Sequence, residues 1–275
     1  MLHYELFYAT GPSDEWVVFV HGAGGSTKTW SYQLEDFRGH FNLLLIDLRD
    51  HGRSKDIQPP FKSYQFSIIS EDIKQVLDRA GITKAHFITL SFGSVLVQDL
   101  YMRYPELVDR LIIAGGIFKG NVFIRAFVQL ARFMNLFLRY STMYRLFSYL
   151  LMPRKRNQTA RRIYQMQAAK LTQEEYLKWV GLYAEFFRLL HHFYYQNLRV
   201  ETLVIMGRED YVFLKAAKSF SKRQSKTRLE IIKLAGHIVN IDRAHEFNDM
   251  AISFLKKVDN KDYTPEDRSW PIPTN

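Results

Sequence analysis

Six short apolar runs, separated by helical patterns, constrain the fold of this sequence more than any other feature. They are the segments 17–20, 43–46, 87–90, 111–114, 203–206 and 229–232. Each run is continuous rather than alternating in polarity, which is typical of parallel strands buried on both faces of a sheet. The segment 4–8 predicts one further strand, at an edge of that sheet.

Helical patterns fill the spaces between these runs. Apolar residues at positions 69, 73, 76, 77 and 80 follow the spacing of one buried helix face, and Gly81 ends that helix. Further helices are expected over 95–104, 213–223 and 243–257. Alternating β and α units predict an α/β fold with a doubly wound, mostly parallel sheet. Ligands of such sheets bind at the carboxyl ends of the strands.

The alternation breaks once, between residues 118 and 198. This stretch has no strand-like run, is rich in Phe, Tyr, Leu and Arg, and is expected to be helical throughout. Thr172 and Glu175 form a capping box for its last long helix. The sequence therefore predicts a core domain of residues 1–117 and 199–257, an inserted all-helical cap of residues 118–198, and a polar C-terminal tail of residues 258–275.

The first helix of the predicted cap has an unusual pattern. Nearly every residue from 122 to 138 is apolar, except for one polar stripe formed by Arg125, Gln129, Arg132, Asn135 and Arg139. Such a helix is expected to be buried on most sides, against the core and its neighbours. The alternative is a basic amphipathic surface that makes weak contact with an anionic membrane.

The net charge of +10 is concentrated in the same region. Between residues 118 and 200 there are fourteen lysines and arginines against three glutamates, a local charge of +11, so the rest of the chain is close to neutral. This charge could steer anionic substrates or lipid interfaces to the cap, or it could form only a solvated outer face. Nucleic acid is not an expected partner, because only the clusters at 154–156 and 161–162 favour it.

The composition sets the class of protein. Hydrophobic residues make up 47% of the chain, enough for a large core, and there is no cysteine, which excludes disulfides and thiolate metal sites. We see neither a signal peptide at the N-terminus nor an apolar run of the ~18 residues that a membrane span needs. A cytoplasmic protein is therefore expected.

Ser91 is the first candidate for a catalytic group. It lies in the segment 86–93, where an apolar strand pattern passes into a helical one. A serine on a sharp turn from strand to helix projects out of the sheet, above the N-terminus of the helix. The usual pattern there is Gly-x-Ser-x-Gly, and Thr89 replaces the first glycine. On its own the segment is also compatible with a serine that only caps a helix.

Serine needs a base to remove its proton, and the base needs an acid to orient it. His237 follows the last strand run, after Gly236, and is the candidate base. Asp210 follows the run 203–206 and is the candidate acid, with Glu209 as the alternative. Asp47, after the run 43–46, is expected to be structural.

A glycine-rich turn follows the strand at 17–20 and reads His21-Gly22-Ala23-Gly24-Gly25. Its glycines allow the backbone to approach a ligand, and its N–H groups could receive an oxyanion. The turn has neither Gly-x-Gly-x-x-Gly nor the Lys-Ser/Thr pair of a P-loop, so nucleotide binding is not expected.

Together these features resemble the α/β-hydrolase superfamily, in its lidded serine hydrolase and esterase branch, over residues 17 to 257. The resemblance rests on five motifs in order: His21-Gly22, Asp47 with His51-Gly52-Arg53-Ser54, Ser91, Asp210, and Gly236-His237. The order Ser, Asp, His is that of this fold and not of other serine hydrolase folds. Thr89 departs from the family pattern, as does Asp50, which stands where the family often has glycine.

The resemblance implies a role for each residue. Ser91 would be the nucleophile, His237 the general base and then acid, and Asp210 the residue that orients His237. The backbone N–H groups of Ala23 and Phe92 would form the oxyanion hole. Supporting positions are His21, Gly22 and Gly93. No cofactor and no metal would be needed. A dehalogenase or epoxide hydrolase of this fold would need Asp at the position of Ser91.

The expected function is cofactor-independent hydrolysis of a small-molecule carboxylic ester with an apolar acyl or ring group, through an acyl-enzyme. The same triad could instead act on a thioester, a lactone or a carbon–carbon bond, because the cap pocket and not the triad sets the substrate. A third interpretation is a hydrolase-like signalling or binding protein with slow turnover.

Overall fold

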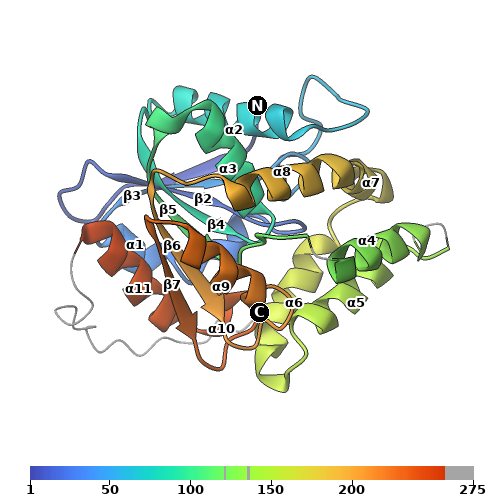
Figure 1. Ribbon diagram of the computed structural model, residues 1–275. Coiled ribbons are helices and arrows are strands. Elements are labelled where there is room, and N and C mark those ends of the chain that lie inside the picture. Colours follow the sequence, from blue (N-terminus) through green and yellow to red (C-terminus); the bar gives the residue numbers. More distant parts are fainter. Residues whose placement is uncertain (121, 135–136, 258–275) are drawn as a thin grey trace.

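The computed structural model describes residues 1–120, 122–134 and 137–257. A seven-stranded sheet in the order β1-β3-β2-β4-β5-β6-β7 runs through its centre (Figure 1). The strands are β1 (Tyr4–Phe7), β2 (Trp16–Val20), β3 (Asn42–Ile46), β4 (Ala85–Leu90), β5 (Val108–Ala114), β6 (Glu201–Gly207) and β7 (Thr227–Ile232). Only the edge strand β1 is antiparallel to its neighbour. The predicted mostly parallel sheet and its edge strand are confirmed.

Helices cover both faces of the sheet, which is why its central strands contain continuous apolar runs such as Val17–Val20 and Leu111–Ala114. The core helices are α1 (Leu34–Arg38), α2 (Phe66–Arg79), α3 (Gly93–Arg103), α9 (Leu214–Arg223), α10 (Val239–Asp242) and α11 (Ala244–Lys256). In Figure 1, α2 and α3 lie on one face and α1 and α11 on the other. Phe19 and Phe87, on neighbouring strands, are fully buried. Each such side chain stabilises the fold by roughly 1.5–3 kcal/mol.

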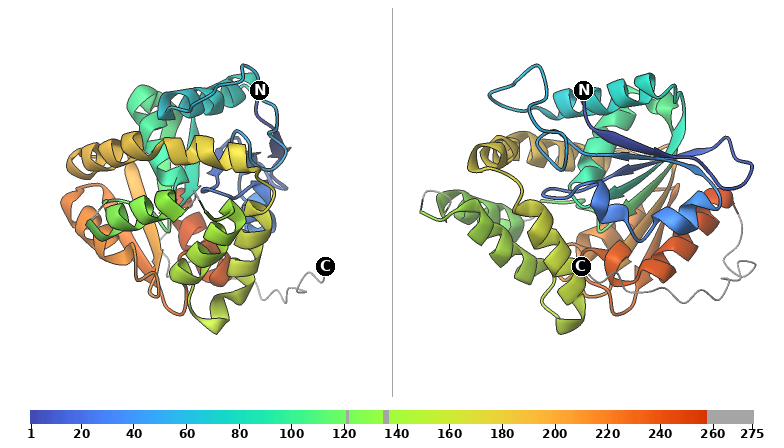
Figure 2. Two further views of the ribbon diagram at one scale, coloured as in Figure 1. Left: turned by 90° about the vertical axis from the view of Figure 1, so that its right-hand side faces the viewer. Right: turned by 180° about the vertical axis from the view of Figure 1, so that it is seen from behind.

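Five helices are inserted between β5 and β6: α4 (Val122–Met134), α5 (Tyr140–Leu151), α6 (Gln158–Ala168), α7 (Gln173–Gly181) and α8 (Tyr183–Tyr195). Figures 1 and 2 show them gathered on one side of the molecule, next to one end of the sheet. We call these helices the cap. Short 3₁₀ helices lie at Thr27–Trp30, Pro105–Leu107 and Lys155–Asn157. The predicted tail of residues 258–275 and Asn135 of the polar stripe lie outside the described residues.

The cap differs from the prediction in two respects. The capping box of Thr172 and Glu175 is present, but its helix α7 ends at Gly181, and α8 begins a new helix. The expected burial of the first cap helix is wrong for the side chains described on its outer side: Leu130 and Phe133 are 54% and 60% exposed. The reason is that no described helix packs over the outer side of α4. No helix in the described part of the chain is long and apolar enough to cross a membrane.

Candidate active site

Ser91 occupies the turn between β4 and α3 in a strained conformation. Its φ of 52° places a residue with a side chain in the left-handed region, which glycine favours. Two hydrogen bonds hold the turn: the Ser91 N–H donates to Ala114 O at 3.0 Å, and the Ser94 hydroxyl donates to Ser91 O at 2.6 Å. Strain of this kind persists only where the surroundings impose it. The turn therefore has the form of a nucleophile elbow.

The residues beside Ser91 explain how this turn packs. A β-carbon at Gly93 would lie 2.7 Å from His21 O and 2.8 Å from Val20 O, so only glycine fits there. Thr89, by contrast, is an ordinary buried strand residue, in register with Val20 on β2 and Ile113 on β5. The threonine is accommodated without a shift in strand pairing.

The structure brings Ser91, His237 and Asp210 into one hydrogen-bonded chain. The distance from His237 Nε2 to Ser91 Oγ is 2.8 Å, and that from His237 Nδ1 to Asp210 Oδ2 is also 2.8 Å. A carboxylate only accepts hydrogen bonds, so Nδ1 carries the proton and Nε2 accepts from the serine hydroxyl. This is the geometry that activates a serine.

Asp210 is held rigidly in its place. Its side chain is fully buried, and its Oδ1 accepts a hydrogen bond from the Phe213 N–H at 3.0 Å. The end of β6 also packs closely on the loop of His237, because a β-carbon at Gly207 would lie 2.0 Å from Gly236 O. The alternative acid, Glu209, makes no hydrogen bond to His237 among the described contacts, and its nearest cation is Arg156 at 3.8 Å.

Two buried histidines shape the glycine-rich turn. His21 Nδ1 donates to Gly22 O, and its Nε2 accepts the Leu48 N–H. His51 Nδ1 donates to Arg49 O, and its Nε2 accepts the Gly24 N–H at 2.9 Å. Burial lowers the pKa of His21 to about 4, and burial together with the neighbouring His21 lowers the pKa of His51 to about 3. Both rings are therefore neutral at pH 7, as these acceptor roles require.

His51 is a positioning residue that sequence reasoning missed. The sequence contains the motif His51-Gly52-Arg53-Ser54, but this motif does not indicate that the ring of His51 accepts the Gly24 N–H. This bond fixes the turn next to Ala23, and both Ala23 and Phe92 line the cavity beside Ser91. Among the described residues, neither of these two N–H groups has an acceptor. Such unpaired donors suit a developing negative charge.

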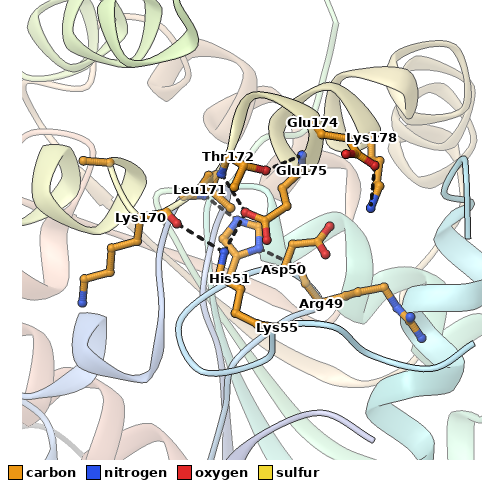
Figure 3. A network of polar contacts seen from close by, with 12 residues as sticks. Arg49, Asp50, His51, Lys55, Lys170, Leu171, Thr172, Glu174, Glu175 and Lys178 are labelled. Atoms are coloured by element: carbon orange, nitrogen blue, oxygen red, sulfur yellow. Dashed lines mark hydrogen bonds and ion pairs between the residues drawn. The ribbon is translucent and has the colours of Figure 1, made fainter. Parts of the chain in front are cut away.

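The loop that carries His51 also fastens the cap to the core (Figure 3). Lys55 Nζ donates to Glu175 Oε2 at 2.6 Å and to Lys170 O at 3.2 Å. The same Glu175 oxygen accepts the Thr172 N–H at the start of α7. Two loops far apart in the sequence are thus joined by one lysine.

The same loop contains the two acidic residues discussed from the sequence. Asp50 adopts a φ of 66°, a value that explains why glycine suits this position. Its carboxylate accepts the Tyr64 hydroxyl at 2.5 Å. Asp47 accepts the N–H groups of Thr27 and Arg53 at 2.7 and 2.8 Å, which agrees with the predicted structural role.

An apolar cavity of about 260 Å³ lies above Ser91 and His237. Its walls come from the core turns and from all five cap helices, and its lining includes Val128 of α4, Phe147 of α5, Ile163 of α6, Trp179 of α7 and Phe186 of α8. The ring of Phe92, next to the nucleophile, stacks on Phe186 at 5.3 Å with an interplanar angle of 9°. The cap therefore forms most of the wall that faces the serine.

Asp242 is a second residue that the sequence did not indicate. Its Oδ2 accepts the Gly236 N–H at 2.8 Å and the Asn157 side-chain amide at 2.7 Å. It thus connects the residue before His237 with the cap. Burial raises the pKa of Asp242 to about 6, although these two donors act in the opposite direction.

We expect Asp242→Asn to weaken the dependence of stability on pH. The carboxyl binds its proton more tightly in the folded chain (pKa about 6) than in the unfolded chain (pKa near 3.8). Its contribution to folding is therefore complete below pH ~4 and is lost as the pH rises to ~6, by roughly 2–3 kcal/mol. Urea unfolding of both proteins near pH ~4 and near pH ~8 measures this difference. Equal pH dependence in wild type and variant would contradict the assignment.

No group of three or more His, Asp or Glu side chains within residues 1–120, 122–134 and 137–257 is placed to hold a metal ion. The hydrogen-bonded polar side chains of Ser91, His237 and Asp210 meet at the cavity floor.

Comparisons with known proteins find similar proteins of the same fold. The family model of the alpha/beta hydrolase fold matches residues 15–129. Over 116 residues the chain is 29% identical to epoxide hydrolase 3 of Mus musculus, covering 42% of this chain and 30% of that protein. Over 120 residues it is 27% identical to the putative carbamate hydrolase RutD of Agrobacterium fabrum, covering 44% and 45%. These matches span less than half the length of either relative.

Among solved structures, the enol-lactonase from Burkholderia xenovorans LB400 aligns with a TM-score of 0.74 at 20% identity, over 93% of this chain and 96% of that one. At this identity the likeness shows the fold alone. With the family match over residues 15–129 and the order of the sheet, it shows the fold: the chain has the α/β-hydrolase fold.

Proposed function

We propose that the protein is a serine hydrolase that cleaves carboxylic esters with an apolar acyl or ring group. The observation that carries this proposal is the chain from Ser91 Oγ through His237 to the buried Asp210, with both contacts at 2.8 Å. It lies at the carboxyl ends of β4, β6 and β7, where ligands of such sheets bind. An epoxide hydrolase of this fold would need a carboxylate at the elbow, and this chain has Ser91 there.

The proposed reaction begins with proton transfer. His237 Nε2 takes the proton of Ser91 as Oγ attacks the ester carbonyl, and the carbonyl oxygen becomes an oxyanion. The N–H groups of Ala23 and Phe92 stabilise that charge. Protonated His237 then gives its proton to the leaving alcohol, and an acyl-serine remains. Water, deprotonated by His237, attacks the acyl group; the carboxylic acid leaves, and His237 returns the proton to Ser91 Oγ.

The cavity supports an apolar acyl or ring group on a small-molecule substrate. Beyond Ser91 and His237, its walls are mostly aliphatic and aromatic side chains of the cap, among them Trp179 and Phe186. Burying methylene groups against such walls strengthens binding by ~0.8 kcal/mol each. The rate constant kcat/KM should therefore rise with acyl length until the cavity is filled.

The test combines a covalent probe with a substrate panel. A fluorophosphonate should label the wild-type protein and not Ser91→Ala. It should also label the control Ser26→Ala, since the Ser26 hydroxyl is engaged with Gln167.

Among p-nitrophenyl esters, kcat/KM should increase from acetyl towards medium chains. Faster turnover of a thioester, lactone, ketone or carbamate with the same acyl group would reassign the bond. A folded protein that is not labelled would indicate a binding or signalling role instead.

A further inference from the structure

The outward side of α4 carries large apolar side chains in contact with solvent. Leu130, Phe133 and Phe137 are 54%, 60% and 75% exposed, and Phe137 follows the end of the helix. The spacing of three residues between Leu130 and Phe133 places these two side chains on one side of the helix. The rings of Phe133 and Phe137 lie 5.5 Å apart, edge to face. The three residues therefore form a continuous apolar strip.

The neighbouring helix α5 adds to this surface. Leu146, Tyr149 and Leu150 are 50%, 53% and 37% exposed and again follow one helical side. Figures 1 and 2 show α4 and α5 side by side at the end of the cap that is farthest from the sheet. We call this surface the outer cap face; it consists of Leu130, Phe133, Phe137, Leu146, Tyr149, Leu150, Arg139 and Arg145. Large exposed apolar patches of this kind mark interaction surfaces.

The charge on this surface has one sign. From residue 118 to residue 173 the sequence has eleven lysines and arginines and no aspartate or glutamate. Arg125, Arg139 and Arg145 are exposed on or next to α4 and α5. The three glutamates between residues 118 and 198 are engaged elsewhere: Glu174 with Lys178, Glu175 with Lys55, and Glu185 with the Phe66 N–H. Among the described ion pairs, none joins Arg125, Arg139 or Arg145 to one of these glutamates.

The outer cap face and the cavity share one residue. Leu150 lines the cavity and is also 37% exposed, and Val128 and Phe147 line the cavity from the same two helices. Leu150 therefore borders both the cavity and the outer cap face.

We propose that the outer cap face docks on the surface of an anionic lipid bilayer. Apolar side chains enter the boundary between head groups and acyl chains, while the arginines contact the negatively charged head groups. A second copy of this chain fits less well, because a symmetric contact would bring the arginines of both copies together without carboxylates between them. The docking does not depend on the reaction proposed for Ser91.

The test is vesicle co-sedimentation of the full chain carrying Ser91→Ala, so that binding is measured without turnover. Vesicles of phosphatidylcholine alone are compared with vesicles that also contain phosphatidylglycerol. We expect binding to the anionic vesicles and a decrease in binding at high salt. Removing two charges with Arg139→Gln and Arg145→Gln should lower the affinity about thirtyfold, given ~1 kcal/mol for each cation near the surface. Phe133→Ser with Phe137→Ser should lower it at least about tenfold.

Matched controls distinguish binding through this surface from a general effect of charge or hydrophobicity. Lys218→Gln with Lys222→Gln removes two exposed cations from α9, and Met102→Ser removes an exposed apolar side chain from α3. Both should bind like the parent protein. Circular dichroism and, with Ser91 restored, turnover of a soluble ester report whether each variant is folded. Equal binding to neutral vesicles, equal loss in the controls, or burial of the outer cap face in a dimer seen by sedimentation equilibrium would overturn the proposal.

Discussion

Ser91→Ala is expected to lower kcat/KM for the best ester by a factor on the order of 10⁵, because no other described hydroxyl lies within reach of His237 Nε2. Loss of the Oγ atom removes the covalent step itself, so that only binding and the backbone donors remain. Alanine can occupy the strained position with φ of 52° about as well as serine can, so the thermal midpoint should change little.

Steady-state rates with p-nitrophenyl esters and a melting curve for each protein measure this effect. Ser26→Ala is the control for loss of a hydroxyl near the glycine-rich turn, and it should retain most of the activity. A Ser91→Ala protein that keeps wild-type turnover would remove Ser91 from the reaction, whatever its geometry.

Asp210→Asn is expected to lower kcat by about four orders of magnitude. The asparagine amide can donate a hydrogen bond to His237 Nδ1, which turns the ring to the tautomer with the proton on Nε2. His237 could then no longer accept the proton of Ser91. The Phe213 N–H still has an oxygen to bond, so the fold around residue 210 should be retained.

The matched control is Glu209→Gln, which alters the neighbouring acid that makes no hydrogen bond to His237 among the described contacts. We expect it to change kcat less than about tenfold, since an acid outside the triad does not set the tautomer of the base. A larger effect of Glu209→Gln than of Asp210→Asn would exchange the roles of the two carboxylates.

The sequence predicted the sheet and the place of the candidate site for a clear physical reason. Buried parallel strands need continuous apolar runs, so these runs located the strands within a few residues. Side chains that follow such strands meet at one edge of the sheet. Ser91, Asp210 and His237 could therefore be grouped before any contact was known.

The contacts that support the site could not be predicted in this way. His51 and Asp242 act on backbone N–H groups of Gly24 and Gly236, and such bonds depend on loop conformations that no periodicity describes. The burial of α4 was mispredicted because an apolar helix was assumed to need a protein partner. Its outer side has none among the described residues.

The cap is attached to the core unevenly, which affects how its specificity could be changed. Helix α7 is tied through Lys55 and Glu175, and α8 through Phe186 stacked on Phe92, whose own N–H is a candidate oxyanion donor. A substitution in these two helices would disturb the backbone around Ser91 as well as the pocket. Helix α4 lines the cavity through Val128 without these ties, whereas Tyr144 of α5 packs against Gly24 of the glycine-rich turn. Directed evolution of a new substrate preference should therefore begin on α4, where the pocket can be varied separately from the turns beside Ser91.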